Sequence, residues 1–322
     1  MPSPGSYWSG RIVVVTGGNG FLGGKVVARL RDAGATVIAP RRSEADLTQS
    51  TAAHELIAGA APTHVFHLAA RVGGIGYNQV APAQLYLDNL RMGTNTIEAA
   101  RAAGVDKTVI LGTVCSYPKF TPVPFREESL WDGYPEETNA PYGIAKKALL
   151  VHAQVNAAQY GQRCAFVIPT NLYGPGDKFH ESVSHVIPAL IKKCTEARER
   201  GDATVSVWGT GTASRDYLYA DDAAEGVVRA GEVDTGTEPI NLGNNHEVTI
   251  RETAETIARA TGFAGELAWD PSKPDGQPRR RVDATRAERV LGWRASTPFE
   301  VGIRATVEWY LANRTNAEAP PA

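Results

Sequence analysis

A tyrosine and a lysine that could transfer a proton stand four residues apart in this sequence. They lie in the run Tyr142-Gly-Ile-Ala-Lys146, and this spacing places both side chains on one face of a helix. An isolated phenol has a pKa of about 10, so proton transfer near neutral pH needs a neighbouring positive charge that stabilises the phenolate. The spacing itself is common, and its meaning depends on the elements around it.

A glycine-rich turn separates the first expected strand from the first expected helix. Residues 11–16 are rich in β-branched side chains, Gly17, Gly20 and Gly23 follow, and an apolar helical pattern covers residues 21–33. Glycine allows a tight turn and the close approach of a pyrophosphate, which the free N–H groups of a helix N-terminus bind. The turn predicts a dinucleotide site, with an ordinary glycine-rich turn as the alternative.

Two arginines follow the second expected strand, in the run Ala39-Pro-Arg-Arg-Ser43. Enzymes that select NAD usually carry an acidic residue there, which binds the ribose 2′-hydroxyl. The guanidinium groups of Arg41 and Arg42 instead suit a 2′-phosphate, which favours NADP(H) over NAD. The alternative is that both arginines are solvated surface charges.

Strands and helices alternate along the chain, which predicts an α/β fold with a Rossmann-type, doubly wound parallel sheet and a smaller α/β substrate-binding lobe at the C-terminal side. We expect strands at 11–16, 36–39, 64–67, 108–111 and 164–168, and helices at 21–33, 82–103, 141–160, 186–198, 221–230 and 250–261. The expected nucleotide-binding domain comprises residues 1–169 and roughly 214–240. The lobe comprises 170–213 and 241–313, and 314–322 is expected to be a frayed tail.

The composition favours a small polar substrate. A formal net charge of −2 argues against non-specific binding to nucleic acid or to anionic membranes. No apolar run is long enough to span a membrane and the N-terminal residues lack a signal-peptide pattern, so we expect a cytoplasmic protein. The three cysteines form no CxxC pattern, and we expect neither a disulfide nor a metal site.

Further motifs, spread over most of the chain, accompany the glycine turn and the Tyr142–Lys146 pair. They are His67-Leu-Ala-Ala70, Val72-Gly-Gly-Ile75 with Asn78, Leu111-Gly-Thr113, Cys115-Ser-Tyr-Pro-Lys119, Glu136-Glu-Thr-Asn-Ala-Pro-Tyr142, Pro169-Thr-Asn-Leu-Tyr-Gly-Pro175, Ser184-His-Val-Ile-Pro188, Val207-Trp-Gly-Thr-Gly211 with Arg215, and Lys273-Pro-Asp-Gly-Gln-Pro-Arg279. Together they resemble the extended short-chain dehydrogenase/reductases and, within them, the GDP-L-fucose synthase family. That family epimerises a nucleotide-linked 4-keto-6-deoxy sugar at C3 and C5 and then reduces C4.

The resemblance implies five catalytic residues, which are Thr113, Cys115, Tyr142, Lys146 and His185. A 4-keto group acidifies the protons on C3 and C5, so that a thiolate can remove one and an imidazolium can return it from the opposite face. By this motif match, Cys115 and His185 form the acid/base pair. Tyr142 would then protonate the C4 oxygen, with Lys146 tuning the phenol and Thr113 bonding the developing alkoxide.

The resemblance also implies which residues bind the cofactor and the substrate. The cofactor residues are Gly17, Gly20, Phe21, Leu22, Arg41, Arg42, Asp46, Leu68, Ala69, Ala70, Tyr142, Lys146, Pro169, Asn171 and Leu172; the substrate residues are Gly74, Asn171, His185, Lys193, Trp208, Arg215 and Lys273. Thr113 stands where the family typically has Ser, and Lys193 where it has Arg. For Cys115, His185 and Trp208 the alternatives are a buried thiol, a helix-capping histidine and a core tryptophan.

Two other functions remain open on the sequence. One is a redox-neutral nucleotide-sugar epimerase of the GDP-mannose 3,5-epimerase type, which retains NAD. The other is a non-catalytic NADP(H)-binding protein on the same fold. The resemblance implies two partners. One is a nucleotide sugar, with GDP as the favoured nucleotide, and the other is a second copy of the chain that packs through the helices at 90–103 and 142–160.

Overall fold

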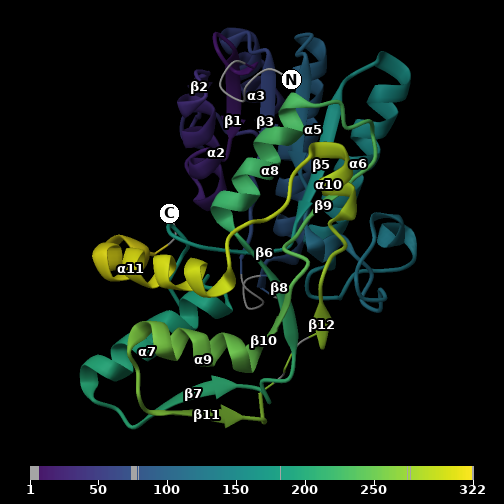
Figure 1. Cartoon of the computed structure of the whole chain (residues 1–322). Helices are drawn as coiled ribbons and strands as arrows, with labels where there is room; N and C mark the ends of the chain where they lie inside the picture. Colours follow the sequence, from purple (N-terminus) through teal and green to yellow (C-terminus); the bar gives the residue numbers. More distant parts are fainter. Residues whose placement is uncertain are drawn as a thin grey trace.

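The computed structural model describes residues 7–73, 78, 80–181, 183–273, 275 and 277–320. They form a large sheet layered between helices and a smaller lobe beneath it (Figure 1). The main sheet has six strands in the order β2-β1-β3-β4-β5-β9, and every pairing in it is parallel. Its strands are β1 (Ile12–Thr16), β2 (Thr36–Ile38), β3 (His64–His67), β4 (Lys107–Leu111), β5 (Cys164–Pro169) and β9 (Ile240–Leu242). The expected α/β fold is confirmed.

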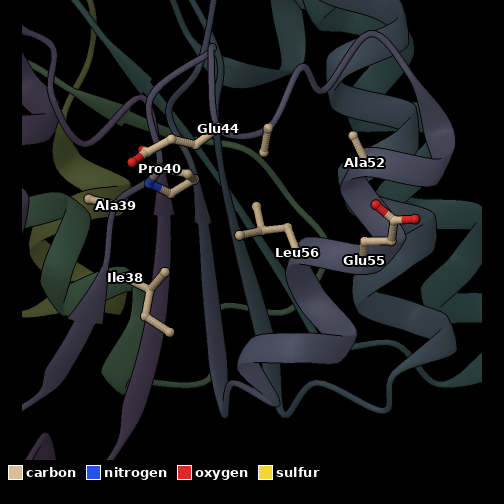
Figure 2. Close-up of a pocket in the computed structure, with 8 residues that line it drawn as sticks. Ile38, Ala39, Pro40, Glu44, Ala52, Glu55 and Leu56 are labelled. Atoms are coloured by element: carbon tan, nitrogen blue, oxygen red, sulfur yellow. The ribbon is translucent and has the colours of Figure 1, made fainter.

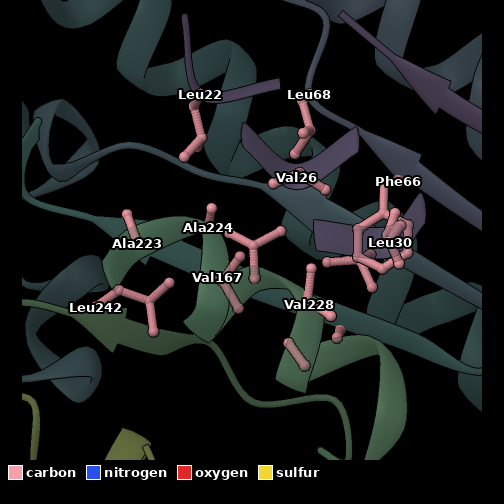
Figure 3. Packing of buried hydrophobic residues seen from close by; sticks show 14 of the residues in the cluster. Leu22, Val26, Leu30, Phe66, Leu68, Val167, Ala223, Ala224, Val228 and Leu242 are labelled. Atoms are coloured by element: carbon pink, nitrogen blue, oxygen red, sulfur yellow. The ribbon is translucent and has the colours of Figure 1, made fainter. Parts of the chain in front are cut away.

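Helices cover both faces of this sheet, as the alternation of side chains along β1 requires. Val13 and Val15 point into a core shared with α2 (Phe21–Asp32) and α8 (Ala220–Glu232), whereas Val14 points into the opposite core beneath α3 (Ser50–Ala60). Figure 3 shows the first core, where leucine and valine side chains of α2 meet alanine and valine side chains of α8. Burial of apolar side chains on both faces explains why the strands are almost continuously hydrophobic.

The second face continues over the other half of the sheet. The long helices α5 (Pro82–Ala102) and α6 (Ala140–Tyr160) pack against each other and cover β4 and β5. Two short 3-10 helices, η1 (Val114–Ser116) and η2 (Glu127–Trp131), lie in the connection between β4 and α6. This connection therefore leaves the sheet at the carboxyl end of β4, the edge where parallel α/β sheets bind ligands.

The smaller lobe has its own sheets and core. β8 (Ser214–Tyr219) pairs with β10 (Glu247–Thr249), β12 (Arg279–Arg280) and β6 (Asn171–Tyr173), and β7 (Thr204–Trp208) pairs with β11 (Glu266–Asp270). The helices α7 (Val186–Arg200), α9 (Ile250–Thr261) and α11 (Phe299–Ala317) complete the lobe. The short helix α10 (Thr285–Leu291) packs instead on the main core, through Ala287 and Leu291.

Three segments lie differently from the expected division. Residues 214–219 were expected in the nucleotide-binding domain but pair with strands of the lobe, whereas β9 and α10, expected in the lobe, belong to the main sheet and its core. The expected frayed tail is helical up to Ala317, which is buried in the lobe and accepts the Phe179 N–H at 3.0 Å, and Arg314 pairs there with Glu199 and Glu318. These assignments depend on pairing between distant segments, which local sequence patterns do not report.

Candidate active site

The glycine turn joins β1 to α2 and packs closely against the neighbouring backbone at the helix N-terminus. Gly17 has φ +72°, and a Cβ atom there would lie 2.7 Å from the backbone nitrogen of Ala69. A Cβ atom at Gly23 would lie 2.0 Å from the carbonyl oxygen of Gly17, so the helix can pack this closely only with glycine. No side chain caps α2 at its N-cap residue, Gly20. The first-turn N–H groups, including those of Phe21 and Leu22, suit a pyrophosphate.

A cavity of about 360 Å³ lies between the end of β2 and α3 (Figure 2). Its lining is Ile38, Ala39, Pro40, Glu44, Ala45, Ala52, Glu55 and Leu56. Arg41 and Arg42 are both exposed on the adjoining turn. The Glu44 carboxylate accepts the Arg41 backbone N–H at 2.6 Å, and Arg42 pairs with Asp46 at 3.4 Å. The lining combines aliphatic side chains with the carboxylates of Glu44 and Glu55, and Arg41 and Arg42 follow it directly in the sequence, where guanidinium groups suit a 2′-phosphate.

Asp46 orders this turn through its own hydrogen bonds. Its carboxylate accepts the backbone N–H of Thr48 at 3.1 Å and the Thr48 hydroxyl at 2.8 Å. These bonds are the main reason that the pKa of Asp46 lies below its usual value. Asp46 is therefore ionised beside Arg42.

The ends of β3 and β5 bring the remaining cofactor candidates to the same edge of the sheet. Leu68, Ala69 and Ala70 follow β3, and the Ala69 N–H donates to the Thr16 hydroxyl at 3.3 Å. Pro169 ends β5, with Asn171 and Leu172 in β6 directly after it. The Asn171 side chain donates to the backbone oxygen of Asp216 at 3.0 Å, which ties this segment to the smaller lobe.

Tyr142 and Lys146 lie on the first two turns of α6, with the Lys146 ammonium 5.9 Å from the centre of the Tyr142 ring. Lys146 is only 1% exposed, and its ammonium has no hydrogen-bond partner in the part of the chain that the structure describes. Burial lowers its pKa to about 8. A buried ammonium without a partner is costly, so a ligand hydroxyl at this point would satisfy it. The ribose hydroxyls of a nicotinamide cofactor fit this requirement.

The environment of Tyr142 favours the protonated phenol. Burial raises its pKa, and the nearby Cys115 thiol raises it further. A hydrogen bond with the Thr113 hydroxyl acts in the opposite direction. Tyr142 is thus a proton donor at neutral pH, in hydrogen-bond contact with Thr113 and close to Cys115.

The turn that carries Cys115 is held tightly against α6. A Cβ atom at Gly143 would lie 2.4 Å from the Cys115 carbonyl oxygen, and the Ser116 hydroxyl donates to the Gly143 carbonyl oxygen at 3.0 Å. The Cys115 N–H donates to the Thr113 hydroxyl oxygen at 3.2 Å. Cys115 itself is half-buried, unlike the two buried cysteines. The structure thus brings Thr113, Cys115 and Tyr142 together.

His185 stands apart from this group, at the N-cap of α7 in the smaller lobe. Its side chain makes no capping hydrogen bond, so the capping alternative is wrong. The residue is exposed, yet desolvation by the surrounding protein lowers its pKa, with Lys178 as a second cause. Exposure combined with desolvation is typical of the wall of a cleft. No hydrogen bond or ion pair among the described residues links His185 to Cys115.

The remaining substrate candidates gather on the lobe. Trp208 ends β7 and is 62% exposed, so the alternative of a core tryptophan is wrong. The ammonium groups of Lys193 and Lys273 lie 5.9 Å and 5.7 Å from the centre of its ring. Such a surface can stack a nucleobase and pair with phosphate. Gly74 lies outside the described residues.

Arg215 faces a second arginine that the sequence analysis missed. Arg280 on β12 is in register with Arg215 on β8, and Gln277 bonds both, accepting from Arg215 at 2.7 Å and from Arg280 at 3.1 Å. Burial lowers the pKa of Arg215, and the charge of Arg280 lowers it further. Neither arginine forms an ion pair with a carboxylate among the described residues, so the two guanidinium groups suit a diphosphate.

Asp275 is a second residue that was missed. Its carboxylate accepts the backbone N–H of Thr210 at 2.7 Å and the Thr210 hydroxyl at 2.8 Å, which fixes the loop after Trp208. A Cβ atom at Gly209 would lie 2.2 Å from this carboxylate. Asp275 lies in the same sequence motif as Lys273, and the motif alone does not show that its carboxylate binds the loop after Trp208.

Two absences concern only the described residues. No cluster of three or more histidine, cysteine, aspartate or glutamate side chains there could hold a metal ion. Among the same residues, no helix is long and apolar enough to cross a membrane.

Comparison with known proteins assigns the family. Residues 13–243 match the NAD dependent epimerase/dehydratase family. The chain is 39% identical over 312 residues to the GDP-L-fucose synthase of Escherichia coli strain K12, covering 94% of this chain and 97% of that protein. It is 40% identical over 308 residues to the probable GDP-L-fucose synthase 1 of Oryza sativa subsp. japonica, covering 95% of this chain and 94% of that protein.

A solved structure gives the same result. A crystal structure of a GDP-L-fucose synthetase from Naegleria fowleri bound to NADP has a TM-score of 0.89 at 32% identity, covering 97% of this chain and 96% of that chain. The chain belongs to the NAD dependent epimerase/dehydratase family.

Proposed function

We propose that this protein is a bifunctional 3,5-epimerase/4-reductase that acts on a GDP-linked 4-keto-6-deoxy sugar and forms GDP-L-fucose or a close relative. The observation that carries the proposal is the packing of the Cys115 turn against the helix of Tyr142 and Lys146. A thiol and a phenol that meet at one point can serve epimerisation and reduction of the same sugar. NADP-linked and fucose-synthase relatives support the same assignment.

Epimerisation depends on Cys115 and His185. Cys115 removes a proton from C3 or C5, and the electron pair moves onto the C4 carbonyl oxygen as an enolate. His185 returns a proton to the opposite face of that carbon. Desolvation lowers the pKa of His185, which makes its protonated form a stronger acid toward the enolate and reduces the fraction of His185 that carries the proton at neutral pH.

Reduction depends on the groups around Tyr142. The hydride for C4 would come from NADPH when it is bound. The Tyr142 phenol gives its proton to the C4 oxygen, and the Thr113 hydroxyl bonds that oxygen while charge develops on it. The Lys146 ammonium holds the ribose hydroxyls and stabilises the phenolate that remains.

The lobe binds the nucleotide part of the substrate. In this proposal, Trp208 stacks on the base while Lys193, Lys273 and Arg215 neutralise the diphosphate. Asn171 contributes at the junction of the two sheets. Gly74 remains a predicted contact.

The cofactor is NADP(H) in this proposal. The exposed Arg41 and Arg42 stand beside the adenosine-sized cavity, where a 2′-phosphate would lie. A retained NAD would not need these charges, which speaks against a redox-neutral epimerase. The Tyr142–Lys146 pair and Cys115 speak against a protein that only binds the cofactor.

The decisive experiment combines two measurements on one sample. Purified protein receives GDP-4-keto-6-deoxy-D-mannose and NADPH in deuterium oxide, and NADPH absorbance is followed while NMR records deuterium at C3 and C5. We expect stoichiometric loss of NADPH and deuterium at both carbons. Cys115→Ser should bind NADPH normally but incorporate no deuterium. Deuterium uptake without NADPH loss indicates the redox-neutral epimerase, and neither signal indicates a binding protein.

We also infer a homodimer and a cytoplasmic location. Val151 and Val155 on α6 are 42% and 52% exposed, which suits a helix face that packs on a second copy. Equilibrium sedimentation measures this state directly, and a monomer at micromolar concentration contradicts it. The cytoplasm supplies NADPH and keeps a half-exposed catalytic thiol reduced.

A further inference from the structure

The turn that carries Cys115 is anchored on its downstream side by a buried tyrosine. Tyr117 is 3% exposed, and its phenol donates a hydrogen bond to the side-chain oxygen of Asn241 at 2.8 Å. The Tyr117 ring packs against Phe125 with 5.1 Å between the ring centres. Asn241 is fully buried in β9, at the edge of the main sheet. The bond therefore joins a one-turn 3-10 helix to a fixed strand.

Asn241 is itself bonded through every polar group of its side chain. Its amide nitrogen donates to the carbonyl oxygens of Phe125 at 3.0 Å and Asp283 at 3.2 Å, while its oxygen accepts from Tyr117. Its backbone N–H donates to the carboxylate of Glu127 at 2.9 Å. A side chain with all its bonds satisfied and no exposure is held in one orientation.

The same network reaches β12, the strand that carries Arg280. Phe125 donates to the carbonyl oxygen of Arg281 at 2.8 Å and accepts from the N–H of Asp283 at 2.8 Å. Arg281 directly follows β12, which pairs with β8 of the lobe. Tyr117 and Asn241 thus connect the thiol-bearing turn both to the main sheet and to the substrate lobe.

We propose that Tyr117 and Asn241 are positioning residues that fix the Cys115 thiol for proton transfer. The inference rests on the proposed function. Thr113 lies two residues after the end of β4 and Tyr142 lies on α6, so both are placed by regular elements outside the Tyr117 bond. Of the proposed catalytic groups, only Cys115 lies in the short turn between Thr113 and Tyr117, which is held by the Ser116–Gly143 bond on one side and by the Tyr117–Asn241 bond on the other. Loss of the bond therefore slows epimerisation more than hydride transfer.

The test is Tyr117→Phe, which removes one hydroxyl and keeps the aromatic packing. Epimerisation is measured as deuterium uptake at C3 and C5. Hydride transfer is measured separately in the reverse direction, as single-turnover NADPH formation from NADP⁺ and GDP-L-fucose, where C4 is oxidised before any epimerisation. Displacement of a catalytic group by about 1 Å can cost about 100-fold in rate. We expect deuterium uptake to fall at least about tenfold and reverse hydride transfer to stay within about twofold.

Tyr310→Phe is the matched control, since Tyr310 is also a fully buried tyrosine whose phenol donates to a side chain, Glu318, in the distant lobe at 2.6 Å. It should leave both rates unchanged. A proportional fall of both rates in Tyr117→Phe, or undiminished deuterium uptake, overturns the inference. Absence of deuterium uptake in the unmodified protein instead overturns the proposed function.

A second measurement needs no substrate. Cys164 and Cys194 are buried, so alkylation of the folded holoenzyme by iodoacetamide reports Cys115. We expect the alkylation rate to change at least about threefold in Tyr117→Phe and not in Tyr310→Phe, because thiol reactivity depends on access and orientation. An unchanged rate contradicts the positioning role even if the sugar proves to be different.

Discussion

Replacement of Lys146 by Met should stabilise the protein in the absence of cofactor while it removes activity. Lys146 is 1% exposed and its ammonium has no partner among the described residues. Burial lowers its pKa from 10.5 to about 8. A tenfold change in a dissociation constant corresponds to about 1.4 kcal/mol, so the buried charge costs the folded state about 3 kcal/mol. Methionine fills a similar volume without a charge, and we expect a gain of about 1 to 3 kcal/mol at pH 7.

The lowered pKa of Lys146 also determines how the free energy of unfolding changes with pH. Below pH 8 the lysine is charged in both the folded and the unfolded chain, and the full cost is present. Between pH 8 and 10.5 the unfolded chain binds more protons than the folded chain, so stability rises with pH. Above 10.5 the cost is gone. The advantage of Lys146→Met should therefore shrink as pH rises from 8 to 10.5.

Thermal unfolding at several pH values measures this difference, with and without NADPH. Lys147→Met is the control, because the neighbouring ammonium donates to the carbonyl oxygen of Leu130 and its removal should destabilise the protein. Saturating NADPH should raise the unfolding temperature of the unmodified protein more than that of Lys146→Met. A less stable Lys146→Met protein at pH 7, or a difference that does not depend on pH, would refute the reasoning.

Four further outcomes follow from the site. Tyr142→Phe should lower kcat for NADPH oxidation by about 100-fold or more and leave NADPH binding unchanged in a fluorescence titration, and normal turnover would exclude its role as proton donor. Arg42→Ala should raise the KM for NADPH by about tenfold or more but not the KM for NADH, whereas equal effects on both would argue against a 2′-phosphate contact. Gly143→Ala should slow deuterium uptake at C3 and C5, because the new Cβ would lie 2.4 Å from the Cys115 carbonyl oxygen. In the control Gly59→Ala the new Cβ meets open space, and the rate of deuterium uptake measured by NMR should not change. The kcat/KM for NADPH should fall as pH rises through about 8, where Lys146 loses its charge, and a flat profile up to pH 9.5 would contradict this assignment.

The amino-acid sequence by itself determined the local elements and the chemistry that they present. The valine run of β1, the glycines after it and the Tyr142–Lys146 spacing each act over a few residues, because backbone conformation and helix periodicity are local properties. The doubly wound sheet follows from the alternation of such elements. The motifs around Cys115 and His185 also indicate a reaction class through their resemblance to a known family.

Only the tertiary structure decided which distant groups meet. Arg280 stands opposite Arg215 because β12 pairs with β8, and Asn241 reaches Tyr117 across 124 residues of sequence. Strand register and burial depend on contacts between segments that are far apart in the chain, and no local pattern encodes them. The Lys146 ammonium was recognised from its spacing to Tyr142, but its burial without a partner became visible only after the chain had closed around it.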